Sequence, residues 1–229
     1  MILRIRHITL ALLVFLLFLS ACETSSSPTE KTVANGMIPA SLATIEALAE
    51  DIIDFVPGGN WAKIHSDISE IEKAWATYQP QAVKDGATQT ILGLFSESLS
   101  SLKSAAASQE TLETMQAANN LSVSVIDMFD LYNPAIPTDI GRLDVLERQV
   151  ILDVANQNFT AAGDTLAKIN SVWERVKPSV LEHNGQRASE QFGNSLAIQI
   201  SAQKSKDSKI ITDEAKNGLE IVDALEKLY

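Results

Sequence analysis

The sequence predicts an all-α protein built from two tandem four-helix bundles, each with up-down-up-down topology. Three observations favour this fold class. A helical segment recurs later in the chain at a nearly constant offset. Apolar residues recur at three-four spacing, as they do on one face of a helix. No segment alternates apolar and polar residues over the length of a strand, so we expect no sheet.

The repeat equates residues 38–133 with residues 134–229, which we interpret as two domains that arose by internal duplication. The offset is 98 residues through the first two helices and 97 after one deleted position. The pairs that define it are Ile38 with Ile136, Asn60 with Asn158, Trp61 with Phe159, Trp75 with Trp173, Pro80 with Pro178, Phe95 with Phe192, Leu99 with Leu196, Asn120 with Asn217 and Tyr132 with Tyr229. The boundary falls at Asn133-Pro134-Ala135-Ile136-Pro137, where prolines interrupt the helical pattern.

The first helix of each repeat is predicted to start just after a proline. Ser41 and Asp139 follow Pro39 and Pro137, where a short polar side chain can cap the free N–H groups of a helix. The predicted buried stripes are Leu42, Ile45, Leu48, Ile52 and Phe55 in one copy and Ile140, Leu143, Leu146 and Val150 in the other. Pro57-Gly58-Gly59 and Asn156-Gln157 mark the expected ends of these helices.

The second helix is predicted to begin at Asn60 in one copy and at Asn158 in the other, with both asparagines as caps. Pro80 and Pro178 are predicted to stop it, because proline disfavours helical geometry in the residue before it. The third helix is expected to start after Gly86 and Gly185. The fourth is expected from about Gln109 to Tyr132 and from about Asp207 to Leu228.

Three tryptophans lie on the stripe of the second helix. Trp61, Trp75 and Trp173 alternate there with Ile and Leu at helical spacing, which indicates core packing. Phe159 takes the place of Trp61 in the second copy with no change of pattern. A ligand pocket is the alternative interpretation, because a buried indole N–H needs a hydrogen-bond partner.

Residues 1–21 have the features of an export signal. Arg4 and Arg6 form a short basic region, and residues 8–19 are almost uninterrupted apolar sequence that is too short for a stable membrane span. This run ends in Leu19-Ser20-Ala21-Cys22, which resembles the lipobox of bacterial lipoproteins. The resemblance implies a diacylglycerol on the Cys22 sulfur, cleavage before Cys22 and acylation of the new amino terminus.

A lipid at Cys22 would fix the protein to a membrane, since more than one acyl chain makes a firm anchor. Cys22 is the sole cysteine, and free thiols are unusual in exported proteins. Residues 22–37 are rich in Ser and Thr, and we interpret them as a flexible tether. Glu23 stands where some Gram-negative bacteria place Asp to hold a lipoprotein in the inner membrane. The sequence therefore predicts an extracytoplasmic location on an outer membrane or an outer leaflet.

Charge and residue types limit the chemistry. The formal net charge of −11 repels phosphates, so we expect no nucleic-acid partner. His65 and His183 each stand alone, and neither has Glu three residues before it, so we expect no metal or haem. No complete catalytic motif is present. We therefore predict a protein that is not an enzyme and carries no cofactor.

The first helix carries a ladder of carboxylates at i, i+4 spacing, Glu46, Glu50 and Asp54. Their counterparts in the second repeat are Asp144, Arg148 and Leu152. Acids in a row on one helix repel mildly, so a solvated face is the favoured interpretation and a bound cation the alternative.

These features favour a lipid-anchored binding or scaffold protein of the bacterial cell envelope, with another envelope protein as its partner. The alternative is a receptor for a small ligand or a metal ion, with its pocket inside a bundle or between the two bundles. An exposed apolar patch would favour the protein partner. A closed cavity lined by tryptophan and polar groups would favour the small ligand.

Overall fold

The computed structural model describes residues 36–229, and within them the chain is all-α, as predicted, with no strand. Cys22, the predicted signal and most of the predicted tether lie outside the described residues. A short 3₁₀ helix spans Val56–Gly58. The α-helices of the described part are α1 (Ala40–Phe55), α2 (Trp61–Asp85), α3 (Gln89–Ala107), α4 (Thr111–Phe129), α5 (Thr138–Ala155), α6 (Phe159–Glu182), α7 (Gln186–Ser205) and α8 (Ser208–Glu226).

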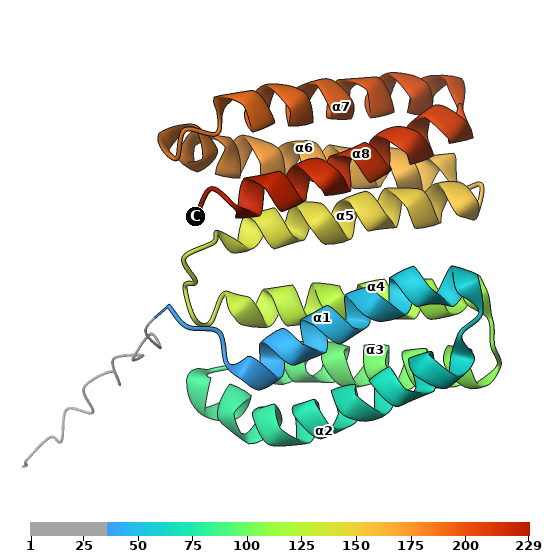
Figure 1. Cartoon of the computed structure of the whole chain (residues 1–229), viewed down its shortest axis with the longest axis vertical. Helices are drawn as coiled ribbons and strands as arrows, with labels where there is room; N and C mark the ends of the chain where they lie inside the picture. Colours follow the sequence, from blue (N-terminus) through green and yellow to red (C-terminus); the bar gives the residue numbers. More distant parts are fainter. Residues whose placement is uncertain (1–35) are drawn as a thin grey trace, which may run out of the picture. The chain divides into compact units, whose positions relative to one another are not determined.

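Figure 1 shows helices α1 to α4 in one group and helices α5 to α8 in another. The buried apolar side chains form two clusters that match these groups. One contains side chains of α1 to α4, from Leu42 to Tyr132, and the other contains side chains of α5 to α8, from Ile140 to Leu225. Helix α4 packs against α1, α3 and α5, and α5 packs against α4, α6 and α8. The contact between α4 and α5 therefore joins the two clusters within one compact unit.

Equivalent aromatic pairs lie at the centre of each cluster. The rings of Trp75 and Phe95 stack with their centroids 3.8 Å apart, and the rings of Trp173 and Phe192 lie 4.7 Å apart. Both tryptophans are buried, which confirms the prediction of core packing. Trp61 is half-buried at the edge of the first cluster.

The predicted caps are correct for α2 and α6 but wrong for α1 and α5. Asn60 accepts a hydrogen bond from the Lys63 amide at 3.3 Å, and Asn158 accepts one from the Ala161 amide at 3.1 Å. In α1 and α5 the cap position belongs to Pro39 and Pro137, so Ser41 and Asp139 lie inside the first turn. Proline suits this position because its backbone there is extended, with ψ of 134° and 130°.

The predicted stops at Pro80 and Pro178 are wrong, since α2 runs on to Asp85 and α6 to Glu182. A proline inside a helix removes one backbone hydrogen bond and strains the preceding turn. The turn beyond each proline buries apolar side chains completely, Ala82 in α2 and Val180 in α6. This burial offsets the lost hydrogen bond and keeps the backbone helical.

Candidate functional site

Ionisable side chains gather where α1, α5 and α8 meet. Helix α1 contributes Glu46 and Glu50, α5 contributes Asp144 and α8 contributes Glu226, and all four line a pocket of about 110 Å³. We call this the acidic pocket. Its other lining residues are Ile38, Ile126, Phe129, Pro134, Ile136, Pro137, Thr138 and Gly141. The pocket thus combines four carboxyl groups with a largely apolar wall.

Arg148 of α5 is the cation that pairs with these carboxyl groups. Its Nη2 lies 2.9 Å from Glu50 Oε1, and its Nη1 lies 3.1 Å from Asp144 Oδ2. The second contact is an ion pair but not a hydrogen bond. Both of its atoms are buried, and neither has a hydrogen-bond partner. Asp144 is only 9% exposed, so this ion pair is shielded from bulk solvent.

Burial raises the pKa values of carboxyl groups that line the pocket. Burial, and then the neighbouring Glu50, raise the pKa of Glu46 to about 9. Burial raises the pKa of Asp144 to about 7, although Arg148 acts in the opposite direction. The pKa of Glu226 is also raised, first by burial and then by Glu50. At neutral pH the pocket therefore retains protons that exposed carboxyl groups would have released.

We favoured a solvated face for the carboxylate ladder of α1, and this interpretation is wrong for two of its three residues. Glu46 and Glu50 are partly buried against α5, where they meet their own counterparts from the second repeat. Only Asp54, at the end of the ladder, is exposed. Helical spacing alone could not reveal this, because it gives the face of a helix but not what covers that face.

A second buried carboxyl group lies inside the cluster of α5 to α8. Glu147 and Gln199 are both fully buried, and Gln199 Nε2 donates to the two carboxyl oxygens at 3.0 and 3.2 Å. Burial is the main cause that raises the pKa of Glu147 to about 8. Gly218 of α8 makes the space, since a Cβ there would lie 2.7 Å from the carboxyl group.

The aligned positions of the first repeat carry no such polar layer. At the offsets of 98 and 97 residues, the equivalents of Glu147, Gln199 and Gly218 are Ala49, Leu102 and Leu121. All three of these apolar residues are fully buried. The sequence repeat therefore held a signal for Glu147 that helical periodicity missed. The first repeat has small Ala49 and large Leu121 at these two positions, whereas the second has large Glu147 and small Gly218.

The contact between α4 and α5 is also polar. Asn119 Nδ2 donates to the Val145 carbonyl and to Gln149 Oε1, both at 3.1 Å. Gln149 Nε2 donates in turn to Asp153 at 2.8 Å, and Thr165 of α6 donates to the other oxygen of Asp153 at 2.8 Å. A chain of hydrogen bonds therefore runs from α4 through α5 to α6.

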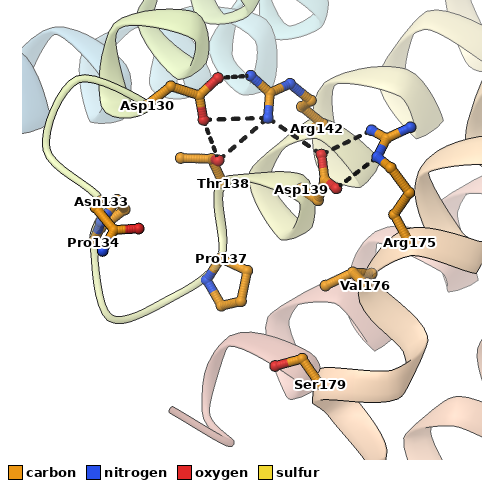
Figure 2. A pocket seen from close by; sticks show the side chains of 10 residues that line it. All are labelled: Asp130, Asn133, Pro134, Pro137, Thr138, Asp139, Arg142, Arg175, Val176 and Ser179. Carbon is orange, nitrogen blue, oxygen red and sulfur yellow. Dashed lines mark hydrogen bonds and ion pairs between the residues drawn. The ribbon is translucent and has the colours of Figure 1, made fainter.

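A larger pocket of about 370 Å³ opens beside the segment that connects α4 to α5 (Figure 2). Figure 2 shows Arg142 pointing toward Asp130 and Asp139, and Arg175 of α6 pointing toward Asp139. Arg175 donates to both oxygens of Asp139, at 3.0 and 2.9 Å. Arg142 donates to Asp130, and to Asp127 and Asp139 at 3.2 Å each.

The charges of this larger pocket neutralise one another. Burial would raise the pKa of Asp139, but the hydrogen bonds and charges of Arg175 and Arg142 outweigh it and lower that pKa. Both arginines are thus occupied, which leaves no free charge for an anion. The cluster explains why Asp139 does not cap α5, and we interpret it as a brace that fixes the start of α5 against α6.

The two histidines of the described residues, His65 and His183, do not line the acidic pocket, and both are exposed. His65 lies on α2, and His183 follows α6, where its ring rests on Tyr229 at 4.2 Å. Within residues 36–229 no three His, Cys, Asp or Glu side chains are placed to hold one metal ion.

Comparison with protein-family models, curated proteins and solved structures finds nothing that matches this chain. Over the described residues, no helix combines the length and apolar character that crossing a membrane requires. The function is therefore argued from the sequence and from the sites described above.

Proposed function

We propose that this protein is a lipid-anchored binding protein of the bacterial cell envelope, composed of two four-helix repeats on a tether. The lipobox ending in Cys22 supports the anchor and the extracytoplasmic location. Two separate apolar clusters, each with its own Trp–Phe pair, support the two repeats. We assign these repeats to two domains, residues 38–133 and residues 134–229.

One observation carries the binding role, namely that helices α1, α5 and α8 place buried and partly buried carboxyl groups around a pocket. A core charge without a ligand destabilises the fold, whereas a charge beside a pocket can be compensated by whatever binds there. The pocket volume of about 110 Å³ is far below the roughly 300–1,000 Å³ of typical small-molecule sites. We therefore assign it to the end of a partner's side chain or to a very small ligand, with no catalytic step.

The small-ligand receptor is kept as the alternative because the pocket lies between the first and second repeats. An envelope protein remains the leading partner, since the rim of the pocket includes Ile136, which is 39% exposed. No tryptophan lines the acidic pocket. The proposal therefore places recognition at the contact of α1, α5 and α8 and not beside the core tryptophans.

The anchor is tested by replacing Cys22 with Ser and labelling growing cells with a fatty-acid analogue. The substituted protein should stay unlabelled and accumulate as uncleaved precursor, while a Ser27→Ala control in the tether should be labelled normally. Labelling of the Cys22→Ser protein would disprove the anchor.

The binding role is tested by placing a photo-crosslinking amino acid at position 136 in the native host. A discrete adduct is expected there, and it should disappear when Asp144 is changed to Asn. The same crosslinker at Ile210, which is 43% exposed on α8, serves as a surface control. An adduct pattern identical at the two positions would argue against the acidic pocket as the binding site.

A further inference from the structure

The two sides of the contact between the repeats are packed differently. Helix α4 packs against α5, and the repeat makes α8 equivalent to α4 and α1 equivalent to α5, but α8 and α1 do not pack against each other in this way. On the packed side, Asn119 of α4 is fully buried and donates to the Val145 carbonyl and to Gln149 of α5. Its equivalent at the offset of 97 residues is Lys216, which is exposed on α8. The side between α1 and α8 is therefore more open than the side between α4 and α5.

A pocket of about 330 Å³ lies on this more open side, and we call it the seam pocket. Helices α1, α4, α5 and α8 all line it, and its volume falls in the roughly 300–1,000 Å³ range of small-molecule sites. It shares no lining residue with the acidic pocket. Each repeat contributes one of the equivalent residues Ile53 and Ile151. The apolar wall of the seam pocket consists of Ile53, Pro57, Met115, Ile151, Leu152 and Leu219.

The hydrogen-bond donors of the seam pocket are unevenly engaged. Arg148 lines it but is already paired with Glu50 and Asp144. Thr212 and Lys216 lie four positions apart on α8, so they share one face of that helix. Neither of these two side chains forms a hydrogen bond or an ion pair within residues 36–229. The edge formed by α8 therefore offers a hydroxyl and an ammonium that are free to donate.

We propose that the seam pocket binds a medium-chain fatty acid, with its carboxylate beside Thr212 and Lys216 and its acyl chain along the apolar wall. An ionised carboxylate only accepts hydrogen bonds, which suits a hydroxyl and an ammonium that have no other acceptor. The acyl chain leaves water when it contacts the apolar wall, and this burial favours binding. The inference goes beyond the binding role assigned to the acidic pocket, and it does not depend on the lipid anchor.

Ligands of other chemistry fit the seam pocket less well. An inorganic anion would leave the apolar wall uncovered, and a neutral hydrocarbon would leave Thr212 and Lys216 without an acceptor. A cation would find one acid in the lining, Asp54 of α1, which is exposed and therefore hydrated. The same cation would be repelled by Lys216. The combination of an apolar wall with free donors at one edge therefore favours an apolar chain with an anionic head.

The experiment labels the full-length protein, in a non-ionic detergent at pH 7, with a photoactivatable diazirine analogue of decanoic acid. After illumination the protein is digested, and the adducts are located by mass spectrometry. Saturable labelling is expected on residues that line the seam pocket, above all Met115, Ile151 and Leu219. Decanoate should displace the analogue. At the same detergent concentration, n-decanol and decylammonium should displace it roughly tenfold less well, because neither carries the charge that Thr212 and Lys216 accommodate.

Lys216→Gln and, separately, Thr212→Val should raise the analogue concentration at half-maximal labelling by roughly tenfold, since each removes a hydrogen bond to the carboxylate. Lys227→Gln is the matched control, because Lys227 is an exposed lysine at the end of α8 that does not line the seam pocket. Asp54→Asn removes a charge that repels the carboxylate, so it should not weaken labelling. Circular dichroism checks that each variant is folded.

The proposal is overturned if labelling does not saturate or falls outside the seam pocket. It is also overturned if n-decanol or decylammonium competes as well as decanoate, if both α8 variants behave like Lys227→Gln, or if Asp54→Asn weakens labelling. None of these results would change the fatty-acid labelling of Cys22 in growing cells or the crosslinking at position 136, so the proposals fail separately.

Discussion

At the scale of single residues, Glu147 shows how one changed position alters the chemistry of a core. Its equivalent Ala49 is a small apolar residue, and the fold accommodates either. The carboxyl group fits only because Gly218 stands where the first repeat has Leu121. Gln199 then supplies the one hydrogen-bond donor that the carboxyl group receives.

Changing Glu147 to Gln should stabilise the protein at neutral and alkaline pH. The folded pKa of about 8 lies above the ordinary value of 4.5, so the folded state binds this proton more tightly than the unfolded state. Stability from the carboxyl group is therefore complete below pH 4.5 and is lost as the pH rises to about 8. Glutamine keeps the shape without ionising, and the gain at pH 8 should be on the order of 4 kcal/mol.

The measurement is denaturant unfolding of wild-type and Glu147→Gln protein between pH 4.5 and 8. The free energy of unfolding should fall less steeply with pH in the variant. Glu220→Gln, an exposed substitution on the same α8 that carries Gly218, should follow the wild-type curve. Parallel curves for Glu147→Gln and wild type would mean that Glu147 is already ionised in the folded protein.

Gly218→Ala should destabilise the protein, although alanine is the better helix former. The added Cβ would lie 2.7 Å from the carboxyl group of Glu147, which is fully buried and held by Gln199. Overpacking of this kind costs about 1–3 kcal/mol. Gly193→Ala in α7 is the control, because nothing lies within 4 Å of its new Cβ and the change should be neutral or stabilising. In thermal melts the unfolding temperature should therefore fall for Gly218→Ala and stay the same or rise for Gly193→Ala.

At the scale of helices, the sequence predicted the existence of each helix and most of their ends. Asn60, Asn158 and the glycines before α3 and α7 gave correct boundaries because their effects are local. Pro80 and Pro178 gave wrong helix ends. The turns that follow them stay helical because of tertiary packing, which the local sequence does not show. The partial burial of Glu46 was hidden for the same reason, since side chains from other helices surround it.

One layer of α5, α7 and α8 can be exchanged for the corresponding layer of the first repeat. The triple variant Glu147→Ala, Gln199→Leu and Gly218→Leu would copy the fully buried set Ala49, Leu102 and Leu121. Replacing buried polar groups by well-packed apolar residues is often neutral or stabilising by about 1–4 kcal/mol. We expect a higher unfolding temperature for the triple variant, measured by calorimetry.

The single change Gln199→Leu is the control for that exchange. It leaves Glu147 buried without its donor, so it should lower the unfolding temperature. A triple variant that is also destabilised would show that the two repeats differ in backbone at this layer, which would weaken the case for equivalent bundles.

At the scale of the whole described part, the contact between the repeats differs in kind from the core of each. Within each cluster the contacts are apolar, whereas the contact between the repeats mixes buried apolar side chains, such as Ile126 of α4 beside Gly141 of α5, with the polar pairs Asn119–Gln149 and Glu50–Arg148. The polar groups can be hydrated again when separated, so we expect less stability to depend on this contact than on either core. The sequence repeat could suggest two modules, but it held no signal for which helices join them.

The first repeat should therefore fold alone. A fragment of residues 36–133 contains the entire apolar cluster from Leu42 to Tyr132. It also keeps the hydrogen bonds of Tyr132 to Tyr78 at 3.0 Å and to Asp85 at 2.6 Å, which tie the end of α4 to α2. The fragment should be strongly helical by circular dichroism and should unfold in one cooperative step. Within it, Trp75→Ala should cost about 3–5 kcal/mol, because the indole stacks on Phe95 in the core. If the fragment has no cooperative transition while the full-length protein has one, the two repeats form a single interdependent domain and the proposed domain boundary at residue 133 is wrong.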